Sequence, residues 1–179
     1  MGIRAAALAI LGAIAILNAG CQSEAEETLD LSDAITHPET GHQYLLSDVG
    51  TWEAAQAQAE ALGGHLVVIN DAAEQQWLVT NFSYQNSGGY LAGEWQAPPF
   101  AYWIGLSDVQ QEGQFVWVTG ESLTFENFAP GEPNNQSPEG WDEDYVAFAL
   151  DPAYSPIPGV WNDGNQERGQ ARGIIEISN

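Results

Sequence analysis

The sequence predicts an α+β domain, because two helix-like segments come first and strand-like segments joined by long loops follow. Apolar residues recur at helical spacing in two stretches before residue 83, and four runs with strand character lie after residue 100. Helices and strands that are segregated along the chain in this way indicate α+β architecture. The length of 179 residues suits one domain of ordinary size with a leader or tail.

The first part of the predicted domain contains a strand, a helix and a second strand. Residues 42–46 have strand character, and Thr51 is a plausible N-cap for a helix that ends at Gly63 and Gly64. A short buried strand is expected over residues 65–69. The apolar side of the helix comprises Trp52, Ala55, Ala59 and Leu62.

The second predicted helix begins after Asp71, which forms a capping-box pattern with Glu74. Its apolar side comprises Trp77, Leu78 and Phe82, and paired glycines and prolines predict a long loop over residues 83–100. Further strands are expected over residues 102–106, 114–118, 144–150 and 171–177, with loops over residues 119–143 and 151–163. Long loops inside a compact domain are usually functional.

Two segments precede the predicted domain, which we place at residues 42–179. Residues 1–20 have signal-peptide character, because Arg4 is followed by an apolar run from Ala5 to Leu17 that is too short to span a bilayer comfortably. Small residues then precede Cys21, and this order resembles the signal of a bacterial lipoprotein, whose cysteine is lipidated. Residues 21–41 are acidic and lack aromatic side chains, so we expect a lipidated Cys21 followed by a flexible stalk.

This leader predicts a location in the bacterial cell envelope, as a lipoprotein of the outer membrane or cell surface. The lipid anchor would be the protein's only contact with the membrane. Cleavage without lipidation, and hence secretion, is the alternative.

The charge balance excludes several classes of partner. The chain carries 25 acidic residues against three Arg and no Lys, which gives a formal net charge of −22. Binding of nucleic acid or of an anionic membrane face depends on clustered basic residues, so neither is expected. With Cys21 as its one cysteine, the chain can form no intrachain disulfide and no cysteine-ligated zinc site, and its three His are scattered along the sequence.

The loop from Glu132 to Asp144 concentrates negative charge. Five of its 13 residues are acidic and none is basic. Such charges repel one another unless something offsets them, and Ca2+ can do so by taking about six to eight oxygen ligands from carboxylates, amides and carbonyls. A solvated acidic loop in a generally acidic protein is the alternative.

Three short motifs carry a resemblance to a known family. Residues Trp103 to Leu106, Glu132 to Asn134 and Trp161 to Asp163 occur in the same order as in the C-type lectin-like domain. The likeness extends from His42 to the C-terminus and includes Glu112 to Phe115. It implies the C-type lectin-like fold, with two helices, small antiparallel sheets and a long calcium-binding loop region, in which Trp161 anchors the loop in the core.

In sugar-binding members of this family, the loop triplet, a later Glu and the Asn–Asp pair jointly hold one Ca2+. The resemblance therefore implies Ca2+ as the cofactor and Pro133 as a cis-proline. Glu143 is taken as the later Glu because Glu143 to Val146 resembles the family's Glu-Asp-Cys-Val, with Glu139 and Asp142 as possible substitutes. The implied ligands are Glu132, Asn134, Glu143, Asn162 and Asp163.

Some members hold a second, auxiliary calcium ion, and the corresponding positions here are Asp108, Glu112, Asn135 and Asp144. For Asp108 and Glu112, an ordinary polar turn before a strand is an equally good interpretation.

The resemblance also implies a function. Glu132, Asn134, Glu143 and Asn162 would hydrogen-bond two vicinal sugar hydroxyls, with the carboxylates accepting and the amides donating. The Glu-Pro-Asn order resembles the class that binds mannose, fucose and N-acetylglucosamine, so the expected partners are glycans on a cell or matrix surface. The alternative is a protein- or surface-binding adhesion module on the same fold. An enzyme is not expected, because no catalytic arrangement stands out.

The chain departs from the family in its cysteines. Members usually carry two disulfides, whose cysteines would fall here at Ala59, Tyr145, and near Gln166 and Ile175. The first and last of these residues are apolar, so we expect packing to replace the long-range disulfide. A native disulfide is typically worth about 2–5 kcal/mol, and calcium binding is one source that could supply this stability instead.

Overall fold

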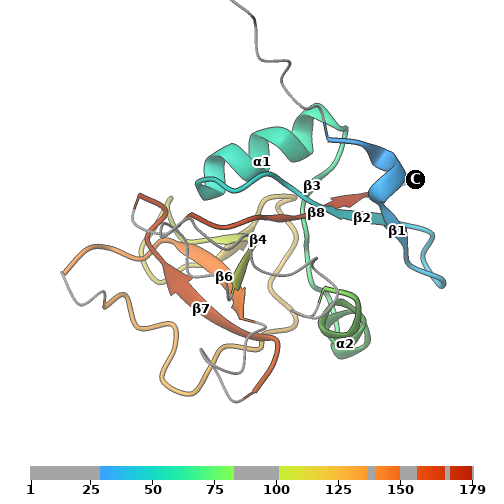
Figure 1. Ribbon diagram of the computed structural model, residues 1–179. Helices are drawn as coiled ribbons and strands as arrows, with labels where there is room; N and C mark the ends of the chain where they lie inside the picture. Colours follow the sequence, from blue (N-terminus) through green and yellow to red (C-terminus); the bar gives the residue numbers. More distant parts are fainter. Residues whose placement is uncertain (1–28, 83–100, 137–139, 150–156, 168–169, 179) are drawn as a thin grey trace, which may run out of the picture.

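The computed structural model describes residues 29–82, 101–136, 140–149, 157–167 and 170–178. Two four-stranded sheets and two α-helices form the fold (Figure 1), which confirms the predicted α+β architecture. Cys21, the preceding leader and the predicted loop over residues 83–100 lie outside the described residues. Within the described residues, the structure contains no helix with the length and apolar character that crossing a membrane requires.

The first sheet joins the two ends of the described chain. Its strand order is β1 (Ile35–Thr36), β2 (Gln43–Leu46), β8 (Ile174–Ile177) and β3 (His65–Leu66), and all neighbours are antiparallel. The late strand β8 therefore lies between two early strands (Figure 1). The strands predicted over residues 42–46, 65–69 and 171–177 are confirmed, although the paired segments are shorter.

Both predicted helices begin where their capping residues indicate. In α1 (Trp52–Ala61), the Thr51 side chain accepts the backbone N–H of Ala54. In α2 (Ala72–Asn81), Asp71 accepts the N–H groups of Ala73 and Glu74. Each cap satisfies helix donors that have no partner within the helix.

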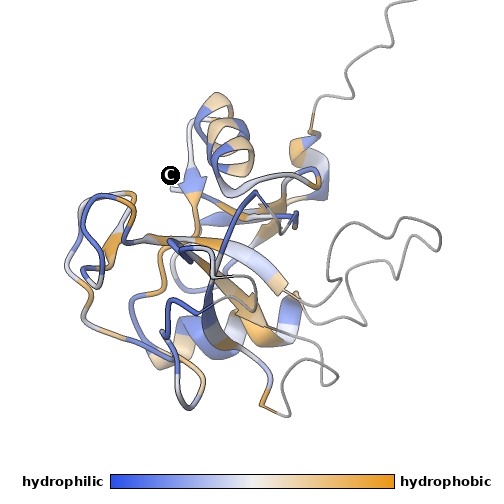
Figure 2. Ribbon diagram, turned by 90° about the vertical axis from the view of Figure 1, so that its left-hand side faces the viewer, coloured by the Kyte–Doolittle hydropathy of each residue, from blue (hydrophilic) through white to orange (hydrophobic). Residues whose placement is uncertain are grey.

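Packing takes the place of the long-range disulfide, as expected. Figure 2 shows that α1 carries both hydrophobic and hydrophilic residues along its length. Ala59 on α1 and Ile175 on β8 are fully buried and share a cluster with Leu45. The helix is thus held on the first sheet by apolar contact.

The second sheet contains one strand that the sequence did not predict. Its order is β5 (Val116–Trp117), β4 (Ala101–Ser107), β6 (Tyr145–Ala149) and β7 (Val160–Gly164). Residues 151–163 were expected to form a loop, and that prediction is wrong for β7. The polar run Asn162 to Gly164 has low strand propensity, but β7 pairs with β6 along its whole length, so tertiary pairing overrides the local preference.

The folded region also begins earlier than predicted. Residues 21–41 were expected to be a flexible stalk, yet a short 3-10 helix, η1 (Leu31–Asp33), and the strand β1 precede residue 42. Ile35 pairs with Tyr44 across the β1–β2 hairpin, and His37 is buried against Trp77 with ring centroids 4.7 Å apart. Backbone pairing and aromatic burial together order an acidic segment whose composition alone indicates flexibility.

One glycine of the Trp-Ile-Gly-Leu motif lies where the two sheets approach each other. Gly105 in β4 donates its N–H to the carbonyl of Val67, just after β3. A Cβ atom at Gly105 would lie 2.5 Å from the carbonyl oxygen of Leu66 and 2.9 Å from Val118. Only glycine permits this approach, which explains its place in the motif.

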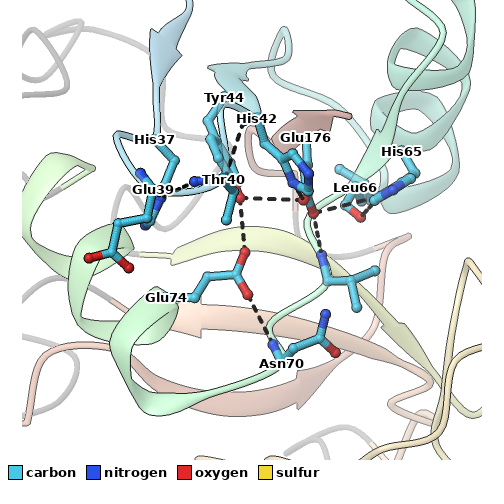
Figure 3. A network of polar contacts seen from close by, with 11 residues as sticks. His37, Glu39, Thr40, His42, Tyr44, His65, Leu66, Asn70, Glu74 and Glu176 are labelled. Carbon is cyan, nitrogen blue, oxygen red and sulfur yellow. Dashed lines mark hydrogen bonds and ion pairs between the residues drawn. The ribbon is translucent and has the colours of Figure 1, made fainter. Parts of the chain in front are cut away.

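A polar network lies between the first sheet and α2 (Figure 3). The buried Glu176 carboxylate contacts His42 Nδ1 at 2.7 Å, and Tyr44 donates its hydroxyl to Glu74 at 2.9 Å. Burial, followed by the neighbouring carboxylates, raises the pKa of Tyr44, and burial raises the pKa of Glu74. The three His, which are scattered in the sequence, all flank Tyr44 and Glu176, so their spacing along the chain is a poor guide to their position in space.

Candidate functional site

The strand β7 carries one part of the predicted calcium site and is fixed by Trp161. Trp161 is fully buried and donates its indole N–H to Gln75 at 3.0 Å. Its ring is surrounded edge-on by Trp117, Phe125 and Phe128. This confirms the prediction that Trp161 anchors the loop region, and it sets the positions of the next two residues, Asn162 and Asp163.

The acidic loop approaches β7 along its backbone. The carbonyl of Trp161 accepts the N–H of Ala129 at 2.8 Å, and the N–H of Trp161 donates to the carbonyl of Asn127 at 2.9 Å. Phe128 pairs with Trp161 in an isolated parallel bridge. The chain therefore reaches Glu132 beside the strand that bears Asp163, although the two residues are far apart in sequence.

The Asp163 side chain is the centre of the site. It is 1% exposed and accepts backbone N–H groups from two consecutive loop residues. Asn134 donates to its Oδ1 at 3.2 Å and to its Oδ2 at 3.1 Å, and Asn135 donates to Oδ2 at 2.7 Å. These bonds fold the loop onto β7 and bring the two predicted ligand segments together.

Two further contacts add Glu143 to this group. Asn135 accepts the N–H of Glu143 at 2.6 Å, and the N–H of Gln136 lies 2.6 Å from Asn134 Oδ1 and 3.1 Å from Glu143 Oε2. Asn135 has a φ of 47°, in the left-handed region that Asn tolerates better than most residues. The resemblance assigned Asn135 to the auxiliary calcium site. In the structure it forms hydrogen bonds with Asp163 and Glu143, two residues of the main predicted site.

Glu132 lies in an environment that disfavours its charge. The Glu132–Pro133 peptide bond is cis, as the resemblance implied. Burial, followed by the adjacent Asp163 and then Glu143, raises the pKa of Glu132 to about 7. Its Oε2 atom is buried and accepts no hydrogen bond from the described residues. A carboxylate oxygen that is buried without a hydrogen bond, beside other carboxylates, favours a cation as its partner.

The auxiliary set forms a second group of acids beside the first. Asp108 is 2% exposed, and its Oδ2 accepts the N–H of Gly113 at 2.8 Å while Oδ1 has no partner among the described residues. Burial, followed by the charge of Asp144, raises the pKa of Asp108. Desolvation, followed by the charges of Asp108 and Asp144, raises the pKa of Glu112, and desolvation followed by Asp142 raises that of Asp144.

The residues present fit Ca2+ in their chemistry. They offer carboxylate and amide oxygens, the donors that a hard cation prefers, and the whole chain has only three Arg to offset its acids. In the parts of the chain that the structure describes, no three carboxylate, histidine or cysteine side chains alone form a group that could hold a metal ion. A calcium site at this place would therefore also need oxygens of other kinds, such as the side-chain amide oxygens of Asn134 and Asn162. Glu139, a possible substitute ligand, lies outside the described residues.

Sequence reasoning missed two residues at the base of this site. Asn165 donates its side-chain N–H to the carbonyl of Asp142 at 2.8 Å, and Gln166 donates to the hydroxyl of Tyr145 at 3.0 Å. The first contact joins the segment after β7 to the segment before β6, and the second joins it to the first residue of β6. The one signal in the sequence that could have indicated the contact of Gln166 with Tyr145 was the resemblance to the family, because the family's cysteines would fall at Tyr145 and near Gln166.

Comparison with known proteins identifies the family. The family model of the lectin C-type domain matches residues 49–148, which include Glu132, Asn134 and Glu143 but end before Asn162. A perlucin-like protein of Mytilus galloprovincialis is 29% identical over 125 residues, covering 69% of this chain and 68% of the relative. A hepatic lectin of Gallus gallus is 32% identical over 117 residues, covering 63% of this chain and 44% of the relative. The chain thus spans less than half of the chicken protein.

Solved structures share the fold over most of the described chain. The carbohydrate-recognition domain of the human scavenger receptor C-type lectin has a TM-score of 0.63 and is 26% identical, with 82% of this chain and 97% of that domain covered. Human lithostathine, at 17% identity and a TM-score of 0.62, has the same fold. Domains of this family generally bind ligands rather than catalyse reactions, and they typically use Ca2+. The family model, the helix and strand order and the three motifs agree, and the chain therefore belongs to the C-type lectin domain family.

Proposed function

We propose that this protein binds glycans of the mannose, fucose and N-acetylglucosamine class in a calcium-dependent manner. The single observation that supports this most strongly is the convergence of Glu132, Asn134 and Glu143 around the buried Asp163. Relatives of this chain include proteins named as lectins, which suggests carbohydrate binding in general. The pKa of Glu132 is raised by burial and by the neighbouring Asp163 and Glu143, and such perturbed carboxylates are concentrated at functional sites.

Glu132, Asn134, Glu143, Asn162 and Asp163 would hold the ion. Bound Ca2+ would neutralise these carboxylates and offer coordination positions to two vicinal sugar hydroxyls. The protein side chains would complete recognition, because Glu132 and Glu143 can accept hydrogen bonds from the hydroxyls and Asn134 and Asn162 can donate hydrogen bonds to them. A hydroxyl both donates and accepts, so each would be satisfied by one acid and one amide.

A glycan array probed in the presence of Ca2+ and of excess chelator tests this proposal. We expect retention on mannose-type glycans with Ca2+ and loss of retention with chelator. The double variant Glu132→Ala, Asn134→Ala should lose both Ca2+ and sugar. Glu126→Ala is a suitable control, because it removes one exposed carboxylate from the same stretch outside the ligand set. Full sugar binding by the double variant would contradict the site assignment.

A protein-binding module is the second candidate. A relative 33% identical over 112 residues is named a low affinity immunoglobulin epsilon Fc receptor of Mus musculus, although the chain spans 26% of it. Trp141, in the acidic loop, is 41% exposed, and aromatic side chains are enriched at protein interfaces. Retention on a protein partner that survives both chelator and free sugar would favour this second function.

We further propose that Cys21 anchors the protein to the bacterial envelope as a lipoprotein. An acyl-anchored protein with several chains stays with membranes, whereas a protein with no acyl chain does not. We expect the full-length protein to fractionate with membranes and Cys21→Ala to appear in the soluble or secreted fraction, with mass spectrometry of the N-terminus as the measurement. An unlipidated N-terminus in the wild-type protein would contradict this proposal.

A further inference from the structure

Tyr145 and Gln166 connect the two segments that bear the proposed ligands. Tyr145 follows Asp144 directly, and Gln166 comes three residues after Asp163. The Gln166 amide donates to the Tyr145 hydroxyl at 3.0 Å. The hydrogen bond therefore links the base of the acidic loop to the chain that leaves β7.

Glu53, in the first turn of α1, completes a closed set of three hydrogen bonds. Its carboxylate accepts the Tyr145 hydroxyl at 3.4 Å, and its backbone N–H donates to the Gln166 side-chain oxygen at 3.0 Å. Three segments that are distant in sequence thus meet at one point: the start of α1, the start of β6 and the chain after β7. We call these three residues the Tyr–Gln–Glu clamp.

The clamp rests on a rigid support. Tyr145 is 6% exposed, and its ring lies 5.0 Å from that of Trp52, whose indole N–H donates to the carbonyl of Ile104 at 2.7 Å.

We propose that Tyr145, Gln166 and Glu53 are positioning residues that hold the two ligand segments at a fixed separation and thereby set the Ca2+ affinity of the site. This inference rests on the calcium-dependent function proposed above. Tyr145 and the neighbourhood of Gln166 are positions where related domains would carry cysteines. The hydrogen bonds therefore connect the two segments that a disulfide would connect in those domains. A site whose ligands are already in place loses less conformational entropy on binding an ion.

The test compares Tyr145→Phe and Gln166→Ala with the parent protein by calorimetric titration with Ca2+ alone and by urea unfolding in chelator. Each variant removes two of the clamp's three hydrogen bonds. Each should therefore bind Ca2+ at least about threefold more weakly, which is the effect expected for the loss of a single net hydrogen bond. Tyr44→Phe is the matched control, because it also removes a tyrosine hydroxyl that donates to carboxylates but belongs to the network of Figure 3. The control should lose stability in urea while binding Ca2+ within about twofold of the parent.

Each alternative result is decisive. If the parent binds Ca2+ and both clamp variants bind it equally well, the clamp has no positioning role. If Tyr44→Phe weakens binding as much as the clamp variants do, the effect is general destabilisation and the inference is overturned. If the parent takes up no Ca2+, the proposed function fails and the inference fails with it.

Discussion

Replacement of Asp163 by Asn is expected to abolish Ca2+ binding and the thermal stabilisation that accompanies it. Asp163 is buried beside Glu132 and accepts N–H groups from Asn134 and Asn135, so it serves both the ion and the loop. The amide of Asn would lack the negative charge and would place an NH2 group where one carboxylate oxygen accepts a backbone N–H. Both the ion and the loop would lose a partner.

The parent protein should show a large response to calcium. A ligand that binds only the folded state at about a hundred times its dissociation constant stabilises that state by about 2.7 kcal/mol. For a domain of this size, that corresponds to a rise in the melting temperature of about 5–10 °C. Scanning calorimetry in millimolar Ca2+ and in chelator measures the difference, and the Asp163→Asn melting temperature should be the same in both.

Two companion variants separate binding from folding. Glu132→Gln removes the charge of a ligand whose side chain makes no hydrogen bond through Oε2, so the fold should suffer less while the calcium response is still lost. Glu126→Gln removes one charge from an exposed position in the same stretch and should leave the response intact. If the melting temperature of the parent protein is the same in calcium and in chelator, the prediction is wrong.

The helices could be predicted from sequence because their signals are local. Thr51 and Asp71 mark the N-caps, and the spacing of apolar residues indicates which side is buried. The strands β1 and β7 could not be predicted in this way. Each is short or polar and depends on pairing with a strand elsewhere, so its stability is not encoded in its own residues.

The residues that meet at the candidate site could be predicted from the sequence, but the hydrogen bonds between them could not. The order of the three motifs named Glu132, Asn134 and Asp163 correctly as neighbours in space. That two loop N–H groups donate to Asp163 depends on backbone angles such as the left-handed φ of Asn135, which no motif specifies. The link between Tyr145 and Gln166 was equally hidden, because it joins residues of unrelated chemistry where the family has cysteines.

Stability is expected to depend on pH through Glu132 in chelator and to lose that dependence in excess calcium. The pKa of Glu132 in the folded protein is about 7, above its ordinary value of 4.5. Between these values the folded state binds a proton that the unfolded state has released. In chelator, the contribution of Glu132 to stability is therefore fully present below about pH 4.5 and is lost as the pH rises through about 7.

Calcium removes this trend because the ion and the proton compete for the same carboxylate. Below about pH 7, each decrease of one pH unit should weaken Ca2+ binding by about tenfold through protonation of Glu132 alone. Asp108 and Asp144, whose pKa values are also raised by burial, would act in the same direction if the auxiliary site binds an ion. In excess calcium the weaker binding at lower pH cancels the proton's stabilisation of the ion-free protein. The contribution of Glu132 to the melting temperature should therefore be nearly constant between about pH 5 and pH 8 in calcium, whereas in chelator it should fall.

Glu132→Gln isolates the group responsible. This variant cannot titrate at residue 132, so in chelator its melting temperature should fall less between about pH 5 and pH 8 than that of the parent, and calcium should not change it. Measuring parent and variant in the same buffers cancels the contributions of the other acids and of the His network. If the variant retains the parent's full pH dependence in chelator, a carboxylate other than Glu132 takes up the proton. That group, and not Glu132, would then be the one whose charge the folded loop disfavours in the absence of a cation.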